Sequence, residues 1–592
     1  MAVAKYKHII GRKVLEVLKK HNYNINPASI ENAVVLNKTQ LRFELPVESI
    51  LKNNVNEAHC NDLLNITIKE DCAIKNVAKS TSEDHRRRLD EDHIHFNIDE
   101  SRFVKDVLQS RDYFHELDDL SLRKSPNTRK KVLVEYSSPN VAKPFHMGNF
   151  RSTIIGNYLS NIHDYFQHDV VRLTYLGDWG KQFGLLQIGL DDLGLSEHNM
   201  SQDKSRDKML QNPIETLFKA YVAANQRAEL DSDVLKRANE IFHSMETGRN
   251  EEVLKRWEIV RKVTVNELSE TYRRLGVRFD DYDWESNYPA STAAPHIESL
   301  RNKGKIRDED GKQVFVLDCG KTVPLLKSDG SSLYLTRDVV AAITRKARYN
   351  FDETIYVVDF SQEEHFVALR NILAELDPRW TDLIKHVKFG RVRGMSTRKG
   401  EVVFLKDILD EARSIMAEKQ EQSATTKDDL PEYVSDVLGI SAVMVNDLKQ
   451  RRMKDYNFDW NSALHVKGDS GIKLQYTHCR LVSLEENCGF QLDEQCFHKC
   501  DTILDPVVIQ LVHQIARFDD VMEESFKTFE SFHIVNYLFK LCNTINKAMK
   551  SLPVKDAPNR DIALQRLLVF HSARIVLNRG MKVLGLKPLD KM

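Results

Sequence analysis

The chain has 592 residues, of which 41% are hydrophobic and 29% are charged. This length exceeds the roughly 150 residues typical of one domain, and the composition is that of a globular protein, so we expect two to four domains with a sizeable core. Lys and Arg number 86 against 87 Asp and Glu, which excludes a generally basic surface for nucleic acid but leaves room for a local basic face.

The first twenty residues and the cysteines indicate in which cellular compartment the protein resides. Residues 1–20 carry six Lys or Arg side chains and one acid, Glu16. This basic, acid-poor start is typical of an organellar transit segment, although it lacks the usual serines. The eight cysteines are scattered along the chain, which favours a reducing compartment over a disulfide framework. No stretch approaches the roughly 18 apolar residues that a membrane span needs.

Two polar stretches, 79–88 and 418–429, lack a hydrophobic period and are predicted to be solvated linkers. They suggest a small N-terminal region, a large middle and a C-terminal region.

The middle of the chain alternates between predicted strands and helices. Residues 131–135, 170–175 and 354–358 are rich in β-branched side chains and are predicted to be buried strands. A helix is expected to begin near Gly148, and another to cover 363–376. Strands that alternate with helices favour a parallel sheet with crossover helices.

Two further regions are predicted to be helical. The segment from about 190 to 275 has a helical period, and Asn212-Pro213 followed by Glu215 is a favourable helix start. We interpret it as an insertion in the sheet domain. From Glu432 to the end the helical period continues with almost no strand signal, which predicts a helical bundle.

The segment Ser137–Thr153 follows a predicted strand and precedes a predicted helix. Ligands of open α/β sheets bind at the carboxyl ends of strands, where helix N-termini present N–H groups to anions. Gly148 permits a close approach to the backbone, His146 is placed to donate to a phosphate, and Lys143 and Arg151 add charge. The alternative is an ordinary strand–helix loop with a surface histidine.

Two motifs in the correct order carry a family resemblance. His146-Met-Gly-Asn149 resembles the first signature of the class I aminoacyl-tRNA synthetases, and Gly394-Met-Ser-Thr-Arg-Lys-Gly400 resembles the second. The flanking residues 138–143, 150–153 and 175–184 resemble arginyl-tRNA synthetases in particular, closest to the mitochondrial and fungal type. The resemblance covers roughly residues 125 to 592.

The sequence departs from the family pattern at two positions. Asn149 replaces the second histidine of the first signature, and Gly394 replaces the leading lysine of the second. Lys143 resembles the lysine that arginyl enzymes use instead. These departures leave open a catalytically silent tRNA-binding paralogue.

The resemblance implies ATP-dependent ligation of L-arginine to its cognate tRNA through an arginyl-adenylate, with release of AMP and pyrophosphate. Such a reaction needs positioning and donors for the developing phosphate charge, and Mg²⁺ is expected with ATP. The implied catalytic residues are His146, Asn149, Lys143, Ser396, Arg398 and Lys399. The implied ATP-binding residues are His146, Gly148, Asn149, His365, Met395 and Ser396.

A guanidinium is bound best by carboxylates. Tyr334 and Asp338 are four residues apart and would share one face if this segment is helical, and by resemblance they hold the guanidinium of the substrate. A synthetase for another amino acid is the rival that these two residues disfavour. The implied arginine-binding residues are Glu135, Ser138, Pro139, Asn140, Asn149, Glu285, Tyr334, Asp338 and Gln362.

The resemblance also implies RNA contacts, through stacking on aromatic rings and pairing of cations with phosphates. The alternative for each aromatic residue is a place in the core. The candidate tRNA-binding residues are Phe96, Arg451, Tyr456, Tyr476 and Arg480. Cys496, His498 and Cys500 lack the paired spacing of zinc sites, so we expect no metal there.

The expected architecture has three parts. A small N-terminal α+β domain (1–115) is an additional tRNA-binding domain. A Rossmann-like catalytic domain with a parallel sheet and helical insertions (116–430) precedes an all-helical anticodon-binding domain (431–592). We expect a monomer in the mitochondrial matrix, with the cytoplasm as the alternative compartment.

Overall fold

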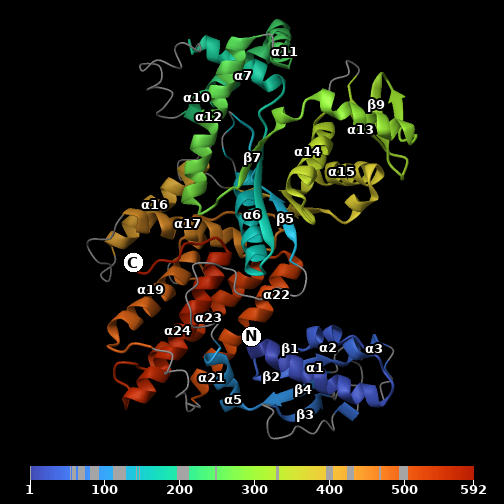
Figure 1. The fold of residues 1–592 in the computed structure, drawn as a ribbon. Helices are drawn as coiled ribbons and strands as arrows, with labels where there is room; N and C mark the ends of the chain where they lie inside the picture. The colour runs from blue at the N-terminus through green and yellow to red at the C-terminus, as the bar shows by residue number, and fades with distance from the viewer. Residues whose placement is uncertain are drawn as a thin grey trace. The chain divides into compact units, whose positions relative to one another are not determined.

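A computed structural model gives the fold (Figure 1). It describes residues 2–53, 55, 62–63, 74–80, 93–110, 129–141, 143, 145, 147–195, 213–246, 250–327, 333–394, 404–422, 432–465, 468–492 and 505–592. The chain forms two compact units. The central unit comprises Leu120–His465 and Val583–Lys587, and the terminal unit comprises Met1–Asp119, Val466–Lys582 and Pro588–Met592. The predicted domain boundaries at 115/116 and 430/431 stay predictions.

A five-stranded parallel sheet in the order β12-β11-β5-β6-β7 lies in the central unit. Its strands are β5 (Lys131–Glu135), β6 (Asp169–Leu176), β7 (Asp281–Trp284), β11 (Glu353–Asp359) and β12 (Ile384–Phe389). The predicted parallel sheet is therefore confirmed. The strand order reverses between β5 and β11, and in open α/β sheets ligands bind at such a switch point.

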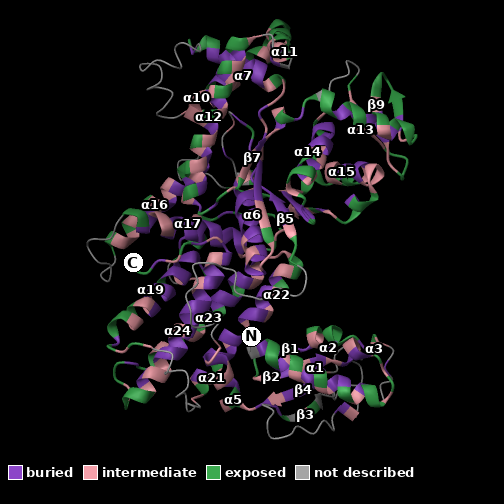
Figure 2. Ribbon diagram, in the orientation of Figure 1, coloured by how far each residue is buried: buried purple, intermediate pink, exposed green. Residues whose placement is uncertain are grey.

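Helices cover the sheet and bury its strands. These helices are α6 (Met147–Tyr165), α14 (Tyr334–Tyr349) and α15 (Glu363–Leu376). Leu133, Leu173 and Tyr356 share a core cluster with apolar residues of α14 and α15. Alternation along a strand places Glu135 on the same face as Leu133, so a carboxylate at the end of β5 is directed toward α14. Figure 2 shows this sheet and α6 as largely buried.

A helical insertion separates β6 from β7, as predicted, but it begins earlier, at Lys181. Its described helices are α7 (Lys181–Asp192), α10 (Pro213–Leu230), α11 (Ser232–Glu246) and α12 (Glu251–Arg274). The helix predicted at Asn212-Pro213 does begin at Pro213. Gly184 and Gly189 of α7 lie so close to the backbones of Ala238 and Ala220 that a Cβ atom would collide with them.

A small antiparallel sheet, which the sequence pattern did not predict, follows β7. It is formed by β8 (Ile306–Glu309), β9 (Lys312–Val316) and β10 (Thr322–Leu326), and α13 (Ala290–Asn302) precedes it. The strands have four or five residues each and no regular alternation of buried and exposed positions, so they give a weak sequence signal.

The end of the central unit is mainly helical. It contains α16 (Leu405–Glu421), α17 (Glu432–Leu448), α18 (Trp460–Ala463) and the strand pair β13 (Val392–Arg393) and β14 (Tyr456–Asn457). The linker predicted over 418–429 is corrected in its first four residues, which are the last turn of α16.

The terminal unit joins the two ends of the chain. Its N-terminal part has the antiparallel sheet β1-β2-β4-β3, with β1 (Val35–Leu36), β2 (Arg42–Pro46), β3 (Ile74–Ser80), β4 (His93–Ile98), α1 (Ala2–Lys20), α2 (Pro27–Ala33), α3 (Val47–Leu51) and α5 (Glu100–Leu108). Its C-terminal part is helical, with α19 (Gly471–Asn487), α21 (Pro506–Ala516), α22 (Phe518–Thr528), α23 (Phe532–Ser551) and most of α24 (Arg560–Val583). The predicted α+β part and helical part are both present.

The basic start of the chain is a core helix. Ile10, Val14 and Leu18 of α1 are fully buried. Lys7 pairs with Asp520 of α22 at 2.7 Å. The amphipathic pattern of residues 1–20 is therefore explained by packing within the terminal unit. No described helix is long and apolar enough to cross a membrane.

Candidate active site at the carboxyl edge of the parallel sheet

A crevice of about 430 Å³ opens at the switch point of the sheet. Its walls come from the segments that follow β5, β11 and β12 and from the first turn of α6. The lining includes Ser138, Gly148 and Asn149, which the sequence singled out, and Asp359, Ser361 and Arg391, which it did not. The α6 N-terminus presents backbone N–H groups here, an arrangement suited to a phosphate chain.

The loop after β5 has a strained backbone. Ser137 and Ser138 have φ values of 72° and 40°, a left-handed conformation that costs free energy in non-glycine residues. Hydrogen bonds to Ser137 stabilise it. Its N–H donates to Oγ of Ser152 at 2.9 Å, and its carbonyl accepts from Nδ2 of Asn149 at 3.1 Å. Its hydroxyl contacts that of Tyr272 at 2.7 Å and accepts from the hydroxyl of Thr153 at 2.8 Å. Asn149 therefore supports the loop that carries the predicted substrate contacts.

The remaining residues of the two signatures lie outside the described residues. These are His146, Met395, Ser396, Arg398 and Lys399. Their predicted roles in phosphate binding stay predictions. The same holds for Asn149, whose amide Nδ2 donates to the loop.

The sequence predicted that Arg151 adds positive charge to the site. The structure corrects this, because the charge of Arg151 is paired within the protein. Its guanidinium is buried, donates to the carbonyl of Gly390 at 2.6 Å and pairs with Asp447 at 3.1 Å. The ring of Tyr456 lies 5.3 Å from the same guanidinium, and its hydroxyl donates to Asp447 at 2.7 Å. This cluster joins α6 to β14 and α17, and the ring contact with Arg151 speaks against the RNA-stacking role predicted for Tyr456.

A buried ionic network lies beneath the loop after β5. Arg345 of α14 pairs with Glu135 of β5 and, at 2.7 Å, with Asp283 of β7. The register of the sheet brings these groups together. Tyr175 of β6 lies opposite Asp283 of β7, and the Tyr175 ring is 4.4 Å from the Arg345 guanidinium. Burial raises the pKa of Glu135 to about 6, although Arg345 acts in the opposite direction. Glu135 also accepts a hydrogen bond from the hydroxyl of Ser138 at 3.4 Å.

A second buried pair lies at the end of β7. Glu285, in the 3-10 turn Glu285–Asn287, pairs with Arg337 of α14 at 2.6 Å. Burial raises the pKa of Glu285 to about 7, and Arg337 opposes this shift. The sequence analysis missed both arginines of these pairs, Arg337 and Arg345, although each is on the helix that carries Asp338.

Asp338 itself is only partly buried. Its Oδ2 atom lies 2.7 Å from Nε2 of His365, in the first turn of α15. Tyr334, one turn earlier on α14, is 60% exposed, and its hydroxyl lies close to Gly180. Asp338 also contributes to the electrostatic environment of Glu135 and Glu285, so the three predicted carboxylates belong to one region. Gln362 is exposed beside it, at the end of the 3-10 turn Phe360–Gln362.

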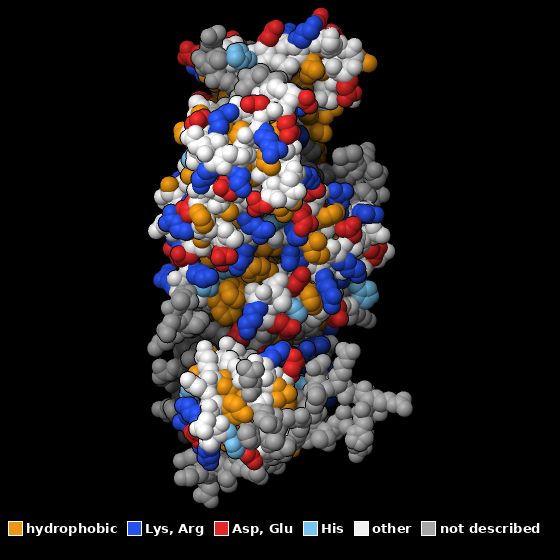
Figure 3. Space-filling view, turned by 90° about the vertical axis from the view of Figure 1, so that its right-hand side faces the viewer, with side chains coloured by type: hydrophobic (Ala, Val, Ile, Leu, Met, Phe, Trp, Pro, Cys, Tyr) orange, Lys and Arg blue, Asp and Glu red, His pale blue; other side chains and the backbone are white. Residues whose placement is uncertain are grey.

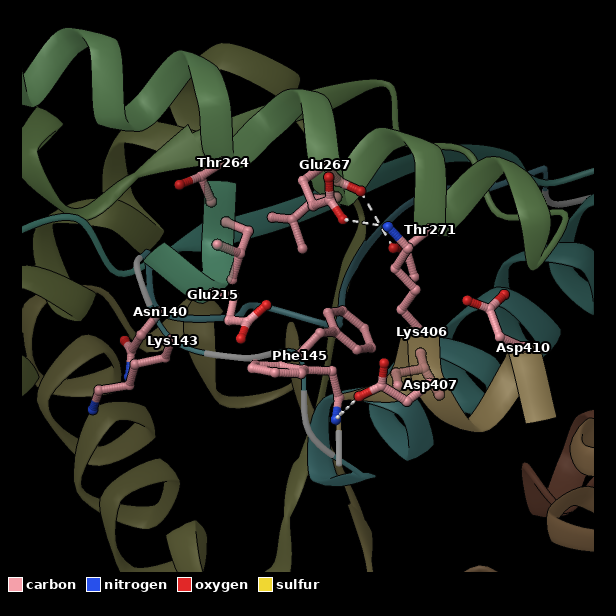
Figure 4. A pocket seen from close by; sticks show the side chains of 14 residues that line it. Asn140, Lys143, Phe145, Glu215, Thr264, Glu267, Thr271, Lys406, Asp407 and Asp410 are labelled. Carbon is pink, nitrogen blue, oxygen red and sulfur yellow. Dashed lines mark hydrogen bonds and ion pairs between the residues drawn. The ribbon is translucent and has the colours of Figure 1, made fainter. Parts of the chain in front are cut away.

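A second cavity of about 290 Å³ is lined in part by Asn140, Lys143 and Phe145, which follow β5. Figure 4 shows Asn140 and Lys143 at one end and Lys406, Asp407 and Asp410 at the other. Lys143, predicted to be catalytic, lies over the ring of Tyr221 at 5.9 Å. It lines this second cavity and is not among the residues that line the crevice at the switch point.

The predicted tRNA-binding residues have different environments. Phe96 is 1% exposed in the sheet of the terminal unit, so its ring is part of the core, and the stacking role predicted for it is corrected. Tyr476 of α19 is 48% exposed, and the guanidinium of Arg480 lies 5.6 Å from its ring. Arg451 is exposed in the central unit. In Figure 3, positive and negative side chains are interspersed over the visible face.

Metal-binding side chains are not clustered in the part of the chain that the structure describes, where no three His, Cys, Asp or Glu residues are arranged to hold an ion. Cys496, His498 and Cys500 lie outside that part. The expectation of no zinc there stays a prediction.

Comparisons with known proteins agree on one family. A model described as tRNA synthetases class I (R), catalytic domain, matches residues 116–460, and one described as DALR anticodon binding domain matches residues 474–592. The probable mitochondrial arginine–tRNA ligase of Mus musculus is 39% identical, over 78% of this chain and 79% of the relative. The cytoplasmic arginine–tRNA ligase of Saccharomyces cerevisiae is 38% identical, over 78% of this chain and 77% of the relative. The arginyl-tRNA synthetase structure from Thermus thermophilus has a similar fold, with a TM-score of 0.76 and 19% identity over 99% of this chain and all of that one.

Proposed function

The chain belongs to the arginine-specific class I tRNA synthetases, and we propose that it performs their reaction at the carboxyl edge of its parallel sheet. The enzyme joins L-arginine to tRNA and uses ATP. In the first step an oxygen of the arginine carboxylate attacks the α-phosphorus of ATP, and pyrophosphate leaves. In the second step a terminal ribose hydroxyl of the tRNA attacks the carbonyl carbon of the adenylate, and AMP leaves.

The crevice at the switch point is the observation that carries the nucleotide part of this proposal. Its walls include the exposed Gly148, which offers backbone to a phosphate, and Arg391, which adds a cation at the end of β12. Such groups stabilise the charge that develops on the phosphates without covalent chemistry by the protein. His146, Asn149, Lys143 and the second-signature residues Ser396, Arg398 and Lys399 complete the proposed donor set. Mg²⁺ enters as part of the substrate, bound to the triphosphate.

The arginine is proposed to lie between this crevice and the first turn of α14. Asp338 and Tyr334 contact its guanidinium, while Ser138, Asn140 and Gln362 contact its amino and carboxylate groups. The strained conformation at Ser137 and Ser138 supports this assignment, because backbone strain is often retained at sites where it orients a functional group.

The tRNA is proposed to contact both units. The helical part of the terminal unit would receive the anticodon, with Tyr476 and Arg480 as an exposed ring and a cation on one helix. The N-terminal α+β part would contact the tRNA elsewhere. We propose that a monomer suffices.

Mitochondrial translation is the proposed setting. The mouse relative is named as mitochondrial and supports it, while the yeast cytoplasmic relative at nearly equal identity supports the alternative. Imaging the full-length protein and a fusion of residues 1–40 to a fluorescent reporter tests the setting. Matrix signal from the full-length protein is expected, and diffuse cytosolic signal from both would contradict it.

Steady-state aminoacylation of cognate tRNA, with wild type and three variants, tests the reaction and the site. Asn149→Ala should reduce adenylate formation by roughly 10- to 100-fold, the scale of one lost hydrogen bond to a charged group. His146→Ala should be at least as damaging, and Asn149→His should keep or raise activity, because it restores the usual donor of the family. An inactive wild type that gains activity only as Asn149→His would identify a silent paralogue.

A further inference from the structure

Three carboxylates surround the proposed arginine site, and two of them are already neutralised by the protein. Glu135 pairs with the internal guanidinium of Arg345, and Glu285 pairs with that of Arg337. Both pairs are buried. A buried carboxylate that already has a guanidinium partner has little reason to exchange it for another, because removing one member of a buried pair leaves an unpaired charge.

Asp338 differs from the other two. The ion pair recorded for it within the described residues is with His365, at 2.7 Å between Oδ2 and Nε2. The side chains of Asp338 and His365 are 28% and 24% exposed, so both are accessible to a small molecule. Of the three carboxylates, Asp338 is therefore the one placed to pair with a guanidinium that arrives from solution.

The geometry of His365 determines how Asp338 can be used. The imidazole contacts one carboxylate oxygen, Oδ2, and leaves Oδ1 for another donor. His365 lies in the first turn of α15, and Asp338 lies one turn after Tyr334, the first residue of α14. These two helices are packed in one core cluster. The contact thus fixes the rotamer of a carboxylate that would otherwise turn freely at a partly exposed helix position.

We propose that His365 is a positioning residue for arginine selection, whose imidazole donates from Nε2 to Oδ2 of Asp338 and orients Oδ1 toward the guanidinium of the substrate. The inference rests on the proposed function, in which Asp338 binds that guanidinium. It also replaces the ATP contact that the resemblance implied for His365, because His365 faces Asp338 and is not among the residues that line the nucleotide crevice.

The test measures Michaelis constants for arginine and for ATP separately, by pyrophosphate exchange in the presence of cognate tRNA. His365→Ala should raise KM for arginine by roughly 10-fold, the scale of one lost hydrogen bond to a charged group, and should leave KM for ATP unchanged. His365→Gln should recover most of the loss, since its amide can donate to the same oxygen. Glu364→Gln is the matched control, because Glu364 is the preceding residue on α15 and pairs with Lys321 at the surface.

Discrimination against citrulline, a neutral analogue of arginine, provides a second readout that general loss of stability would not reproduce. His365→Ala should reduce the preference for arginine, and His365→Gln should restore it. If His365→Ala raises only the KM for ATP, the inference is wrong and His365 contacts ATP instead. Asp338→Asn distinguishes failure of the proposed arginine site from failure of the role proposed for His365. If Asp338→Asn leaves arginine activation intact, the proposed site is wrong. If it abolishes activation while His365→Ala has no effect on KM for arginine, only the role of His365 is wrong.

Discussion

At the scale of single residues, charge pairing distinguishes structural carboxylates from those available to a substrate. Glu135, Asp283 and Glu285 are buried and paired with arginines of the same chain. Asp338 is partly exposed and pairs with a histidine. All four are acidic residues, so residue type alone does not show which of them are neutralised within the protein.

Asp338→Ala should abolish arginine activation while ATP binding persists. The bound guanidinium would lose its partner in a desolvated site, which costs roughly 3–5 kcal/mol and corresponds to about a 10²- to 10³-fold loss or more. Pyrophosphate exchange measures activation, and equilibrium dialysis measures ATP binding. A variant with normal arginine dependence would place the specificity site elsewhere.

The pKa of Glu285 predicts a pH dependence of arginine binding. Because burial raises this pKa to about 7, the negative charge is present above pH 7 and is lost as the pH falls through that value. Protonation would leave the positive charge of Arg337 uncompensated beside the substrate, so KM for arginine should rise several-fold from pH 8 to pH 6.

Two variants identify the group responsible for that rise. Glu285→Gln should have a high KM for arginine at both pH values, with the dependence greatly reduced. His365→Gln replaces the imidazole that contacts Asp338 and should retain the rise if Glu285 causes it. A flat wild-type profile would contradict the assignment.

At the scale of elements, glycines determine how closely the helices of the insertion approach. α7 contacts both α10 and α11, and at Gly184 and Gly189 the neighbouring backbones leave no room for a side chain. The sequence motif around 175–184 resembles the family at these positions, but only the packing explains why a glycine is required at 184.

Gly184→Ala should therefore destabilise the insertion, with a loss of roughly 1–3 kcal/mol typical of overpacking. Differential scanning calorimetry would detect it as a lower melting temperature, and limited proteolysis should locate the first cleavage in α10 to α12. Lys236→Ala, an exposed change on α11, is the control and should melt like the wild type. Equal melting temperatures of the two variants would mean that α7 and α11 can move apart with little loss of stability.

At the scale of the whole molecule, the first and last parts of the chain belong to one compact unit. His513 of α21 contacts the carbonyl of Asn37 at 2.9 Å, and Asp520 of α22 pairs with Lys7 at 2.7 Å. The α+β part therefore contributes to the stability of the unit that contains the C-terminal helices.

Deletion of residues 2–20 should consequently destabilise the terminal unit. The deletion would expose apolar surface that Ile10, Val14 and Leu18 now cover. A lower melting temperature and weaker tRNA binding are expected, with arginine-independent ATP binding retained by the central unit. Replacing the exposed cations Lys5 and Arg12 by Gln should leave the melting temperature unchanged, and so separates loss of packing from loss of charge. A deletion variant that melts like the full chain would show that α1 is dispensable.

The sequence by itself determined the parallel sheet, the helical insertion and the family, because these depend on local patterns: β5 and α15 have the predicted bounds, and two short motifs lie in the correct order. It also identified Asp338, from the surrounding motif and not from its chemistry. Only the tertiary structure decided which charged side chains meet. Arg151, Arg337 and Arg345 are as polar in sequence as any surface arginine, yet each is buried against a carboxylate from a distant segment. Phe96 and the apolar face of α1 are buried for the same reason. Burial depends on what packs against a side chain, and residues far apart in the chain provide that packing.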